Sequence, residues 1–258
     1  MIKLEHAVLP SPEQMQFVIE GMRNPMNSWD KSDSGYQCVC CSNEMCKAEC
    51  TGDDLCPQNG EYRLGDNDHS LMLKLAKSGT DHRKYLRMMP VYVRITAPLY
   101  WWKEFDTYKV GTVANSCSTM HKIAEKEFNR SDFSHEHIPK NPDFYSDTWD
   151  MEKANMFFPV TIQDVVHFSS DDILDFTIQA LNYYREKYIE TKDKKYWWQL
   201  IQLLPSSYNQ TRNSMLNYEV LANIYKSRQN HKLDEWRDFC NWIETLPYSD
   251  LITGKETK

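Results

Sequence analysis

Three polar residues late in the chain have types and spacing suited to holding an anionic ligand. Asn217, Asn223 and Arg228 lie six and five residues apart within Met215–Arg228, where apolar residues recur every three or four positions. This periodicity predicts a helix, on which Asn217 and Arg228 would share a face about three turns apart, with Asn223 somewhat to the side. Because a guanidinium donates paired hydrogen bonds to phosphate, the face is predicted to bind an elongated, phosphate-bearing ligand.

A second set of hydrogen-bonding residues follows the clearest predicted strand. Val91–Thr96 is rich in β-branched residues and alternates in polarity, and Ala97-Pro98 follows it. The polar segments Lys103–Lys109 and Thr112–Thr119 come next, so a rigid element would present many polar side chains at its end. The aromatic residues Tyr100–Trp102 most simply belong to a core, although aromatic walls also suit a planar ring ligand.

The elements that must position these residues are a short strand, several helices and two long polar segments. The pattern predicts a strand over residues 2–8, and Ser11-Pro12-Glu13 predicts a helix that places Phe17, Val18 and Met22 on one face and stops at Asn24-Pro25. Further helices are predicted through Leu71–Ala76, from Ser169 or Ser170 through Tyr188, over Tyr196–Leu204 and over Leu233–Leu246. Segments 30–67 and 131–159 are predicted to be an insertion or loop. With no linker or repeat, residues 1–258 are expected to form one domain.

Composition narrows the classes of function. The net charge is -7, and no Lys/Arg run exceeds three residues, which argues against a dedicated nucleic-acid binder. There are 8 glycines in 258 residues and none in a phosphate-loop pattern, so a nucleotide would have to be held by side chains and helix ends. With no long apolar stretch at the start and no membrane span, the protein is expected to be cytoplasmic and to bind no membrane.

Six of the 8 cysteines fall in one short stretch within residues 30–67. Cys38, Cys41, Cys46 and Cys50 could supply four thiolates to a structural zinc ion, but paired C-x2-C knuckles are missing. The alternative is a reduced, cysteine-rich surface excursion, since disulfides are not expected in a cytoplasmic protein. Both interpretations stay open at this point.

At the residues described above, the chain resembles the flavin-dependent thymidylate synthases. That family has a segment A-P-x5-Q-x2-R-H-R, and here Ala97-Pro98 is followed in register by Glu104, Thr107, Tyr108 and Lys109. The histidine that the family carries before this segment corresponds to His82. The family pattern L-P-x11-N-x5-[NH]-x4-R is matched in full, ending at Arg228. The resemblance covers residues 1–30 and 68–250, which leaves the cysteine-rich segment as an insertion.

The resemblance implies an α+β fold, an antiparallel sheet flanked by helices, assembled as a homotetramer with active sites between subunits. It implies an enzyme that methylates dUMP to dTMP, with FAD as cofactor and NADPH and methylene-tetrahydrofolate as co-substrates. Arg228 would activate the nucleotide as the catalytic residue. The substrate-binding residues implied are Glu104, Thr107, Ser118 and Arg228, and the cofactor-binding residues implied are His82, Tyr108, Lys109, Asn115, Asn217 and Asn223.

Several family residues are replaced here. The R-H-R triplet is Thr107-Tyr108-Lys109, the preceding glutamine is Glu104, and the arginine of the family's S-x-R-Y motif is absent whether Cys117 or Ser118 is aligned with its serine. The alternative hypothesis is therefore a non-catalytic or repurposed member of the family that binds a nucleotide or acts as a structural tetramer.

Overall fold

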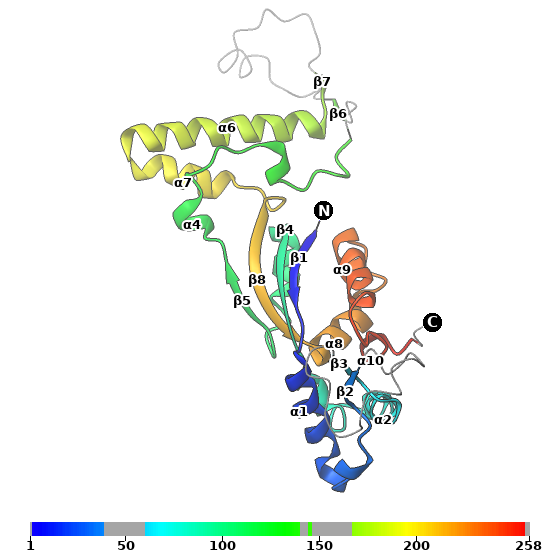
Figure 1. The fold of residues 1–258 in the computed structure, drawn as a ribbon. Helices are drawn as coiled ribbons and strands as arrows, with labels where there is room; N and C mark the ends of the chain where they lie inside the picture. Colours follow the sequence, from blue (N-terminus) through cyan, green and yellow to red (C-terminus); the bar gives the residue numbers. More distant parts are fainter. Residues whose placement is uncertain (1, 39–59, 140–143, 146–166, 256–258) are drawn as a thin grey trace, which may run out of the picture. The chain divides into compact units, whose positions relative to one another are not determined.

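The computed structural model of the chain describes residues 2–38, 60–139, 144–145 and 167–255 (Figure 1). Contacts within it define two compact units, between which the chain passes several times. The helical unit comprises Thr96–Lys103 and Ser116–Thr211. The sheet unit comprises Ile2–Ile95, Glu104–Asn115 and Arg212–Lys258. Each unit is described by itself below.

Strands and helices occur in mixed order along the chain. The strands are β1 (Lys3–Val8), β2 (Gly35–Cys38), β3 (Gly60–Arg63), β4 (Pro90–Pro98), β5 (Val113–Ser116), β6 (Phe144–Tyr145), β7 (His167–Phe168) and β8 (Asn209–Asn217). The helices are α1 (Pro12–Arg23), α2 (Asp66–Lys77), α3 (Leu99–Phe105), α4 (Thr119–Lys122), α6 (Ser170–Thr191), α7 (Lys194–Leu203), α8 (Tyr218–Arg228), α9 (Asp234–Glu244) and α10 (Asp250–Thr253). Helices thus combine with antiparallel sheet, as predicted.

A four-stranded sheet with the order β1-β4-β8-β5 is the largest sheet of the described residues. In β4, Val91, Val93 and Ile95 are buried while Tyr92 and Arg94 are exposed. This alternation is what a strand with one covered face produces, and it confirms the strand predicted over Val91–Thr96. The strand predicted at residues 2–8 is also confirmed as β1.

Helix α1 begins where the sequence indicates. The Ser11 hydroxyl accepts a hydrogen bond from the Gln14 backbone N–H, and the Gln14 side chain accepts one from the Ser11 N–H, which makes a capping box. The predicted buried face was wrong at one position, because Phe17 is 64% exposed. Met15 and Ile19 instead join Val18 and Met22 on the buried face.

Helices α8 and α9 and one face of β4 contribute many of the buried residues of the sheet unit. Leu221 and Ile224 of α8 and Trp236 and Phe239 of α9 are completely buried, and the two helices contact each other. Helix α9 confirms the helix predicted over Leu233–Leu246 and ends two residues earlier. Its indole and phenyl rings meet edge to face at a centroid distance of 6.0 Å.

In the helical unit, α6 and α7 pack against each other. Ser169 caps α6 by accepting from the Asp172 N–H, as its sequence predicts. Leu174, Ile178 and Leu181 of α6 point into an apolar cluster, which also contains Leu200, Ile123, Phe128 and Phe133. The helical character of this part of the chain is confirmed.

The described ends of segment 30–67 are ordered rather than loop-like. Strands β2 and β3 pair antiparallel, with Tyr36 opposite Tyr62, and α2 begins at Asp66. The Asp68 carboxylate is buried and accepts from Arg23 Nε at 2.6 Å and from the Ser34 hydroxyl at 2.6 Å. Residues 39–59 lie outside the described residues, so the cysteine-rich insertion stays a prediction.

The helix predicted over Met215–Arg228 is wrong in its first part. Residues up to Asn217 belong to strand β8, and α8 begins at Tyr218. Within β8, Ser214, Leu216 and Asn217 are buried, so pairing in the sheet overrides the helical spacing of the apolar residues. Asn217 therefore does not share a helix face with Arg228.

Candidate functional site

Arg228 meets two of the other residues nominated from the sequence. Its Nη1 donates to Glu104 Oε2 at 2.7 Å, and its Nε donates to the Tyr108 hydroxyl at 2.9 Å. More than 100 residues of sequence separate Arg228 from both partners, with |i−j| of 124 and 120. All three lie in the sheet unit.

Two further side chains complete this group. Trp236 Nε1 donates to Glu104 Oε2 at 2.9 Å, and the Trp236 ring lies under the guanidinium of Arg228 at 4.8 Å. His231 Nε2 lies 3.5 Å from the same Glu104 oxygen. The Leu233 backbone N–H donates to His231 Nδ1, which favours the tautomer whose Nε2 proton faces Glu104. We call Glu104, Tyr108, Arg228, His231 and Trp236 the Arg228 cluster.

Ordered elements hold the Arg228 cluster in place. Arg228 is the last residue of α8, Trp236 lies in the first turn of α9, and Glu104 lies near the end of α3. The Tyr108 backbone N–H donates to the Phe105 carbonyl, which turns the chain directly after α3. The local folds of three helices thus bring a cation, a carboxylate, a phenol and an indole together.

The guanidinium of Arg228 is already paired within the chain. Its side chain is 19% exposed and that of Glu104 is 35% exposed, so water screens the pair only in part. An anionic ligand could reach the fork of Arg228 only by displacing Glu104 or by binding at the side of the guanidinium that remains open. The cluster can therefore bind an anion by exchange, and its aromatic rings can flank a planar group.

Asn217, nominated for the cofactor, is the N-cap of α8. Its Oδ1 accepts from the Val220 backbone N–H at 2.9 Å, which is the usual role of asparagine at this position. Gly111, with φ +83, comes so close that a Cβ there would lie 3.0 Å from Asn217 Nδ2. The structure thus gives Asn217 a local structural contact.

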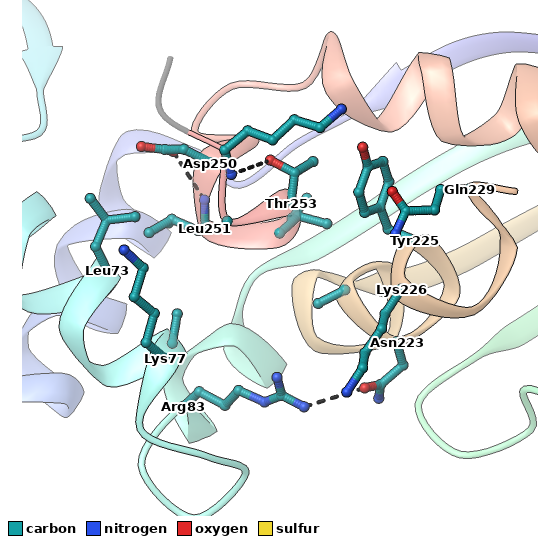
Figure 2. Close-up of a pocket in the computed structure, with 15 residues that line it drawn as sticks. Leu73, Lys77, Arg83, Asn223, Tyr225, Lys226, Gln229, Asp250, Leu251 and Thr253 are labelled. Carbon is teal, nitrogen blue, oxygen red and sulfur yellow. Dashed lines mark hydrogen bonds between the residues drawn. The ribbon is translucent and has the colours of Figure 1, made fainter.

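Asn223 lies at a pocket with Arg83, as Figure 2 shows. Arg83 Nη2 donates to Asn223 Oδ1 at 3.3 Å, and its Nε lies 2.8 Å from the buried carboxylate of Glu219. The pocket is about 280 Å³ in volume and lies between α2, α8 and α10. Asn223 is on a different side of α8 from Arg228, since five residues on a helix correspond to about 500° of rotation.

The remaining nominated residues belong neither to the Arg228 cluster nor to the pocket that contains Asn223. His82, Thr107, Lys109 and Asn115 of the sheet unit are exposed, and the Thr107 hydroxyl donates to the Glu104 carbonyl. Ser118 belongs to the helical unit, where its hydroxyl caps α4 by accepting from the His121 N–H at 3.0 Å.

Sequence reasoning missed His231 and the contact of Glu219 with Arg83. His231 follows the end of α8 by three residues, and an imidazole beside a nominated arginine was a signal that could have found it. Glu219 gives no such signal, because only the fold brings it to Arg83.

The metal prediction falls largely on residues outside the described ranges. Cys41, Cys46 and Cys50 lie there, and the side chain of Cys38 is not described. In the part of the chain that is described, no group of three or more His, Cys, Asp and Glu side chains is placed to hold a metal ion.

Burial raises the pKa of the Cys240 thiol to about 11, so this thiol stays protonated near neutral pH. No helix among the described residues is long and apolar enough to cross a membrane.

We compared the chain with protein families, curated proteins and solved structures. No protein-family model matches the sequence, and no curated protein matches it. Solved structures match over nearly the whole chain, and they give it a fold like that of the flavin-dependent thymidylate synthases.

Two of these structures illustrate the likeness. Thymidylate synthase X (ThyX) from Helicobacter pylori, solved with FAD and dUMP, is 14% identical and has a TM-score of 0.55, covering 98% of this chain and 95% of its own. The UMP/dUMP methylase PolB from Streptomyces cacaoi, bound with 5-Br dUMP, is 13% identical with a TM-score of 0.52, covering 98% of this chain and 94% of its own. At such identities the likeness concerns the fold.

Proposed function

We propose that this protein is a flavin-dependent enzyme that methylates the pyrimidine nucleotide dUMP. One observation carries the proposal: Glu104, Tyr108 and Arg228, nominated from two distant sequence segments, meet in the Arg228 cluster. The ThyX-like fold supports it, because the neighbouring structures hold FAD and dUMP or a brominated dUMP. We further propose a homotetramer in the cytoplasm, with NADPH and methylene-tetrahydrofolate as co-substrates.

Arg228 is the proposed catalytic residue. As negative charge develops on a uracil ring, a fixed guanidinium stabilises it, and the effect is largest when the cation is preoriented. Trp236 and Tyr108 supply that orientation through the ring face and the hydroxyl. Glu104 would leave Arg228 as the nucleotide enters, and Thr107 and Ser118 are the further substrate-binding residues of the proposal.

The donor set in the sheet unit fits FAD in its chemistry. His82, Lys109 and Asn223 are exposed polar side chains, and the Tyr108 hydroxyl remains able to donate. Asn115 and the amide nitrogen of Asn217 complete the proposed cofactor-binding residues. Once reduced by NADPH, the flavin would pass on the reducing equivalents for the methylation.

A second candidate function is a repurposed protein that keeps the fold without the methyl transfer. The specific observation in its favour is the contact of Arg228 Nη1 with Glu104 at 2.7 Å. A carboxylate on one nitrogen of the guanidinium competes with an anionic substrate for that nitrogen, and it would repel a nucleotide phosphate that faced it.

Arg228→Ala is expected to lower kcat/KM for dUMP methylation by about 100-fold, the effect of removing one oriented charge donor. The measurement is dTMP formation by purified protein with FAD, NADPH and methylene-tetrahydrofolate. The matched control is Arg63→Ala, since Arg63 is exposed in β3 and lies outside the Arg228 cluster. The proposal would be contradicted if the absorbance spectrum of FAD did not change when FAD is mixed with the wild-type protein.

Glu104→Gln separates the two candidate functions. Removing the carboxylate that competes for Arg228 is expected to tighten dUMP binding about tenfold. This corresponds to the interaction energy of the partly solvent-screened Arg228–Glu104 pair, which dUMP would no longer have to break. The measurement is calorimetry with dUMP, and the control is Asp106→Asn, whose carboxylate pairs with Arg212 instead. Absence of dUMP binding by both the wild type and Glu104→Gln would favour the repurposed protein.

A further inference from the structure

The helical unit has a pocket that the proposed function does not use. It is about 350 Å³ in volume and is lined by residues of α4 and by the facing ends of α6 and α7. Tyr188 and Trp197 contribute aromatic rings, while Lys192, Lys194 and His121 contribute polar groups. Every lining residue belongs to the helical unit, and none belongs to the Arg228 cluster.

One aromatic ring of the pocket is held in a fixed position, and the other is carried by an ordered helix. Trp197 Nε1 donates to the Met120 backbone carbonyl at 3.1 Å, and Trp197 also packs against the apolar cluster of the helical unit. Tyr188 lies in the last turn of the long helix α6, where the backbone N–H of Lys192 donates to its carbonyl. A preoriented ring surface loses little conformational entropy when a ligand stacks on it.

The charges at the pocket are cationic and lack acidic partners. No Asp or Glu lines it. Lys192 Nζ lies 5.9 Å from the Tyr188 ring, and Lys194 Nζ lies 6.0 Å from the Trp197 ring. Among the residues that the structure describes, neither lysine forms an ion pair; the nearest carboxylate in sequence, that of Asp193, pairs with Lys195.

The helix ends do not cancel this charge. The carboxyl end of α6 contributes about half a negative charge and the amino end of α7 about half a positive charge. These two contributions offset each other, so the two ammonium groups determine the local potential. This is unusual in a chain with a net charge of -7.

We propose that this pocket binds a small molecule consisting of an aromatic ring with an anionic substituent. The ring would stack on Trp197 and Tyr188. The ammonium groups of Lys192 and Lys194, which lie over these rings in the free protein, would move aside to pair with the anion. The volume is at the lower end of the range for small-molecule sites, so it suits one ring system with a short charged arm. Two kinds of molecule combine an aromatic ring with such an anion: an aryl sulfonate or carboxylate, and a nucleoside monophosphate.

The test measures binding of 2-naphthalenesulfonate to the full chain by calorimetry. We expect it to bind at least tenfold more tightly than inorganic sulfate or 2-naphthol, since it satisfies both the rings and the lysines. The double variant Lys192→Gln/Lys194→Gln is expected to lose at least tenfold in affinity, while the control Lys195→Gln, whose side chain does not line the pocket, stays within twofold. Competition by UMP would identify the nucleotide as the source, and failure to compete would identify the aryl acid.

Two further variants keep the test decisive. Tyr188→Leu should weaken 2-naphthalenesulfonate binding with an unchanged melting temperature, whereas Tyr183→Leu, at an exposed ring of α6 that does not line the pocket, should not. Arg228→Ala should leave this binding intact, so that a failure of the proposed enzyme activity is distinguishable from a failure of the pocket. Absence of binding by the wild type, or equal losses in Lys195→Gln and the double variant, would overturn the proposal.

Discussion

Asp68→Asn is expected to lower the free energy of unfolding of the sheet unit by about 3–5 kcal/mol, the cost of leaving a buried charge without its partner. The Asp68 side chain is completely buried, and its partner Arg23 is 4% exposed. One carboxylate oxygen accepts from Arg23, and the other accepts from the hydroxyls and backbone N–H groups of residues 32–34. An amide in its place keeps the shape but loses the charge and presents a donor where acceptors are needed.

Urea denaturation of the wild type and Asp68→Asn measures this loss. Asp66→Asn is the control, because Asp66 is exposed in the first turn of the same helix and should change stability by no more than about 1 kcal/mol. Equal effects of the two substitutions would show that the Asp68 network is not what stabilises this part of the fold.

The same network gives a defined dependence on pH. Burial alone would raise the pKa of Asp68, but hydrogen bonds from Ser34 and Ser32 and the nearby Arg23 hold it below its usual value of 3.8. A folded-state pKa below the unfolded value means that the stabilisation is fully present above about pH 4 and is lost as the pH falls through the folded-state value. The difference between wild type and Asp68→Asn should therefore shrink in acid below pH 4.

Trp236→Ala is expected to destabilise the protein by about 3–5 kcal/mol, because it empties the space of a large, completely buried ring. It should also disorder the Arg228 cluster, since Trp236 supplies a hydrogen bond to Glu104 and a ring face to Arg228. Thermal unfolding measures the first effect. Trp198→Ala is the control, because that ring is 45% exposed and its removal should cost less than about 1 kcal/mol.

Trp236→Phe separates packing from hydrogen bonding in this cluster. Phenylalanine retains most of the apolar contact with Phe239 but lacks the indole N–H that meets Glu104. We expect an intermediate loss of about 1–2 kcal/mol. A loss as large as that of Trp236→Ala would mean that the hydrogen bond rather than the ring is decisive.

Local signals in the sequence were sufficient where a helix or strand is defined by its own residues. The caps at Ser11 and Ser169 depend on contacts between neighbours in sequence, and the alternation along Val91–Thr96 is visible in a short run of residues. All three predictions were confirmed. The ThyX-like fold was anticipated from the resemblance of several motifs to those of the flavin-dependent thymidylate synthases, although the sequence matches no family model. Glu104, Tyr108 and Arg228 were nominated in the same way.

Features that depend on the tertiary structure could not be predicted. Met215–Asn217 shows helical spacing but lies in β8, where strand pairing decides the conformation. Phe17 is as apolar as Val18, and only the position of the neighbouring elements leaves it exposed. The pairing of Arg228 with Glu104 was also not foreseen, because a carboxylate 124 positions away has no recognisable pattern.

The passage from β8 into α8 without an intervening loop limits how the chain can change in length. Asn217 is both the last residue of the strand and the cap of the helix. One inserted residue after Tyr218 would turn the rest of α8 by about 100° relative to the strand, and Arg228 would no longer face Glu104. Arg228 is therefore positioned by a fixed count of residues, so deletions and insertions here should abolish the Arg228 cluster even where single substitutions are tolerated.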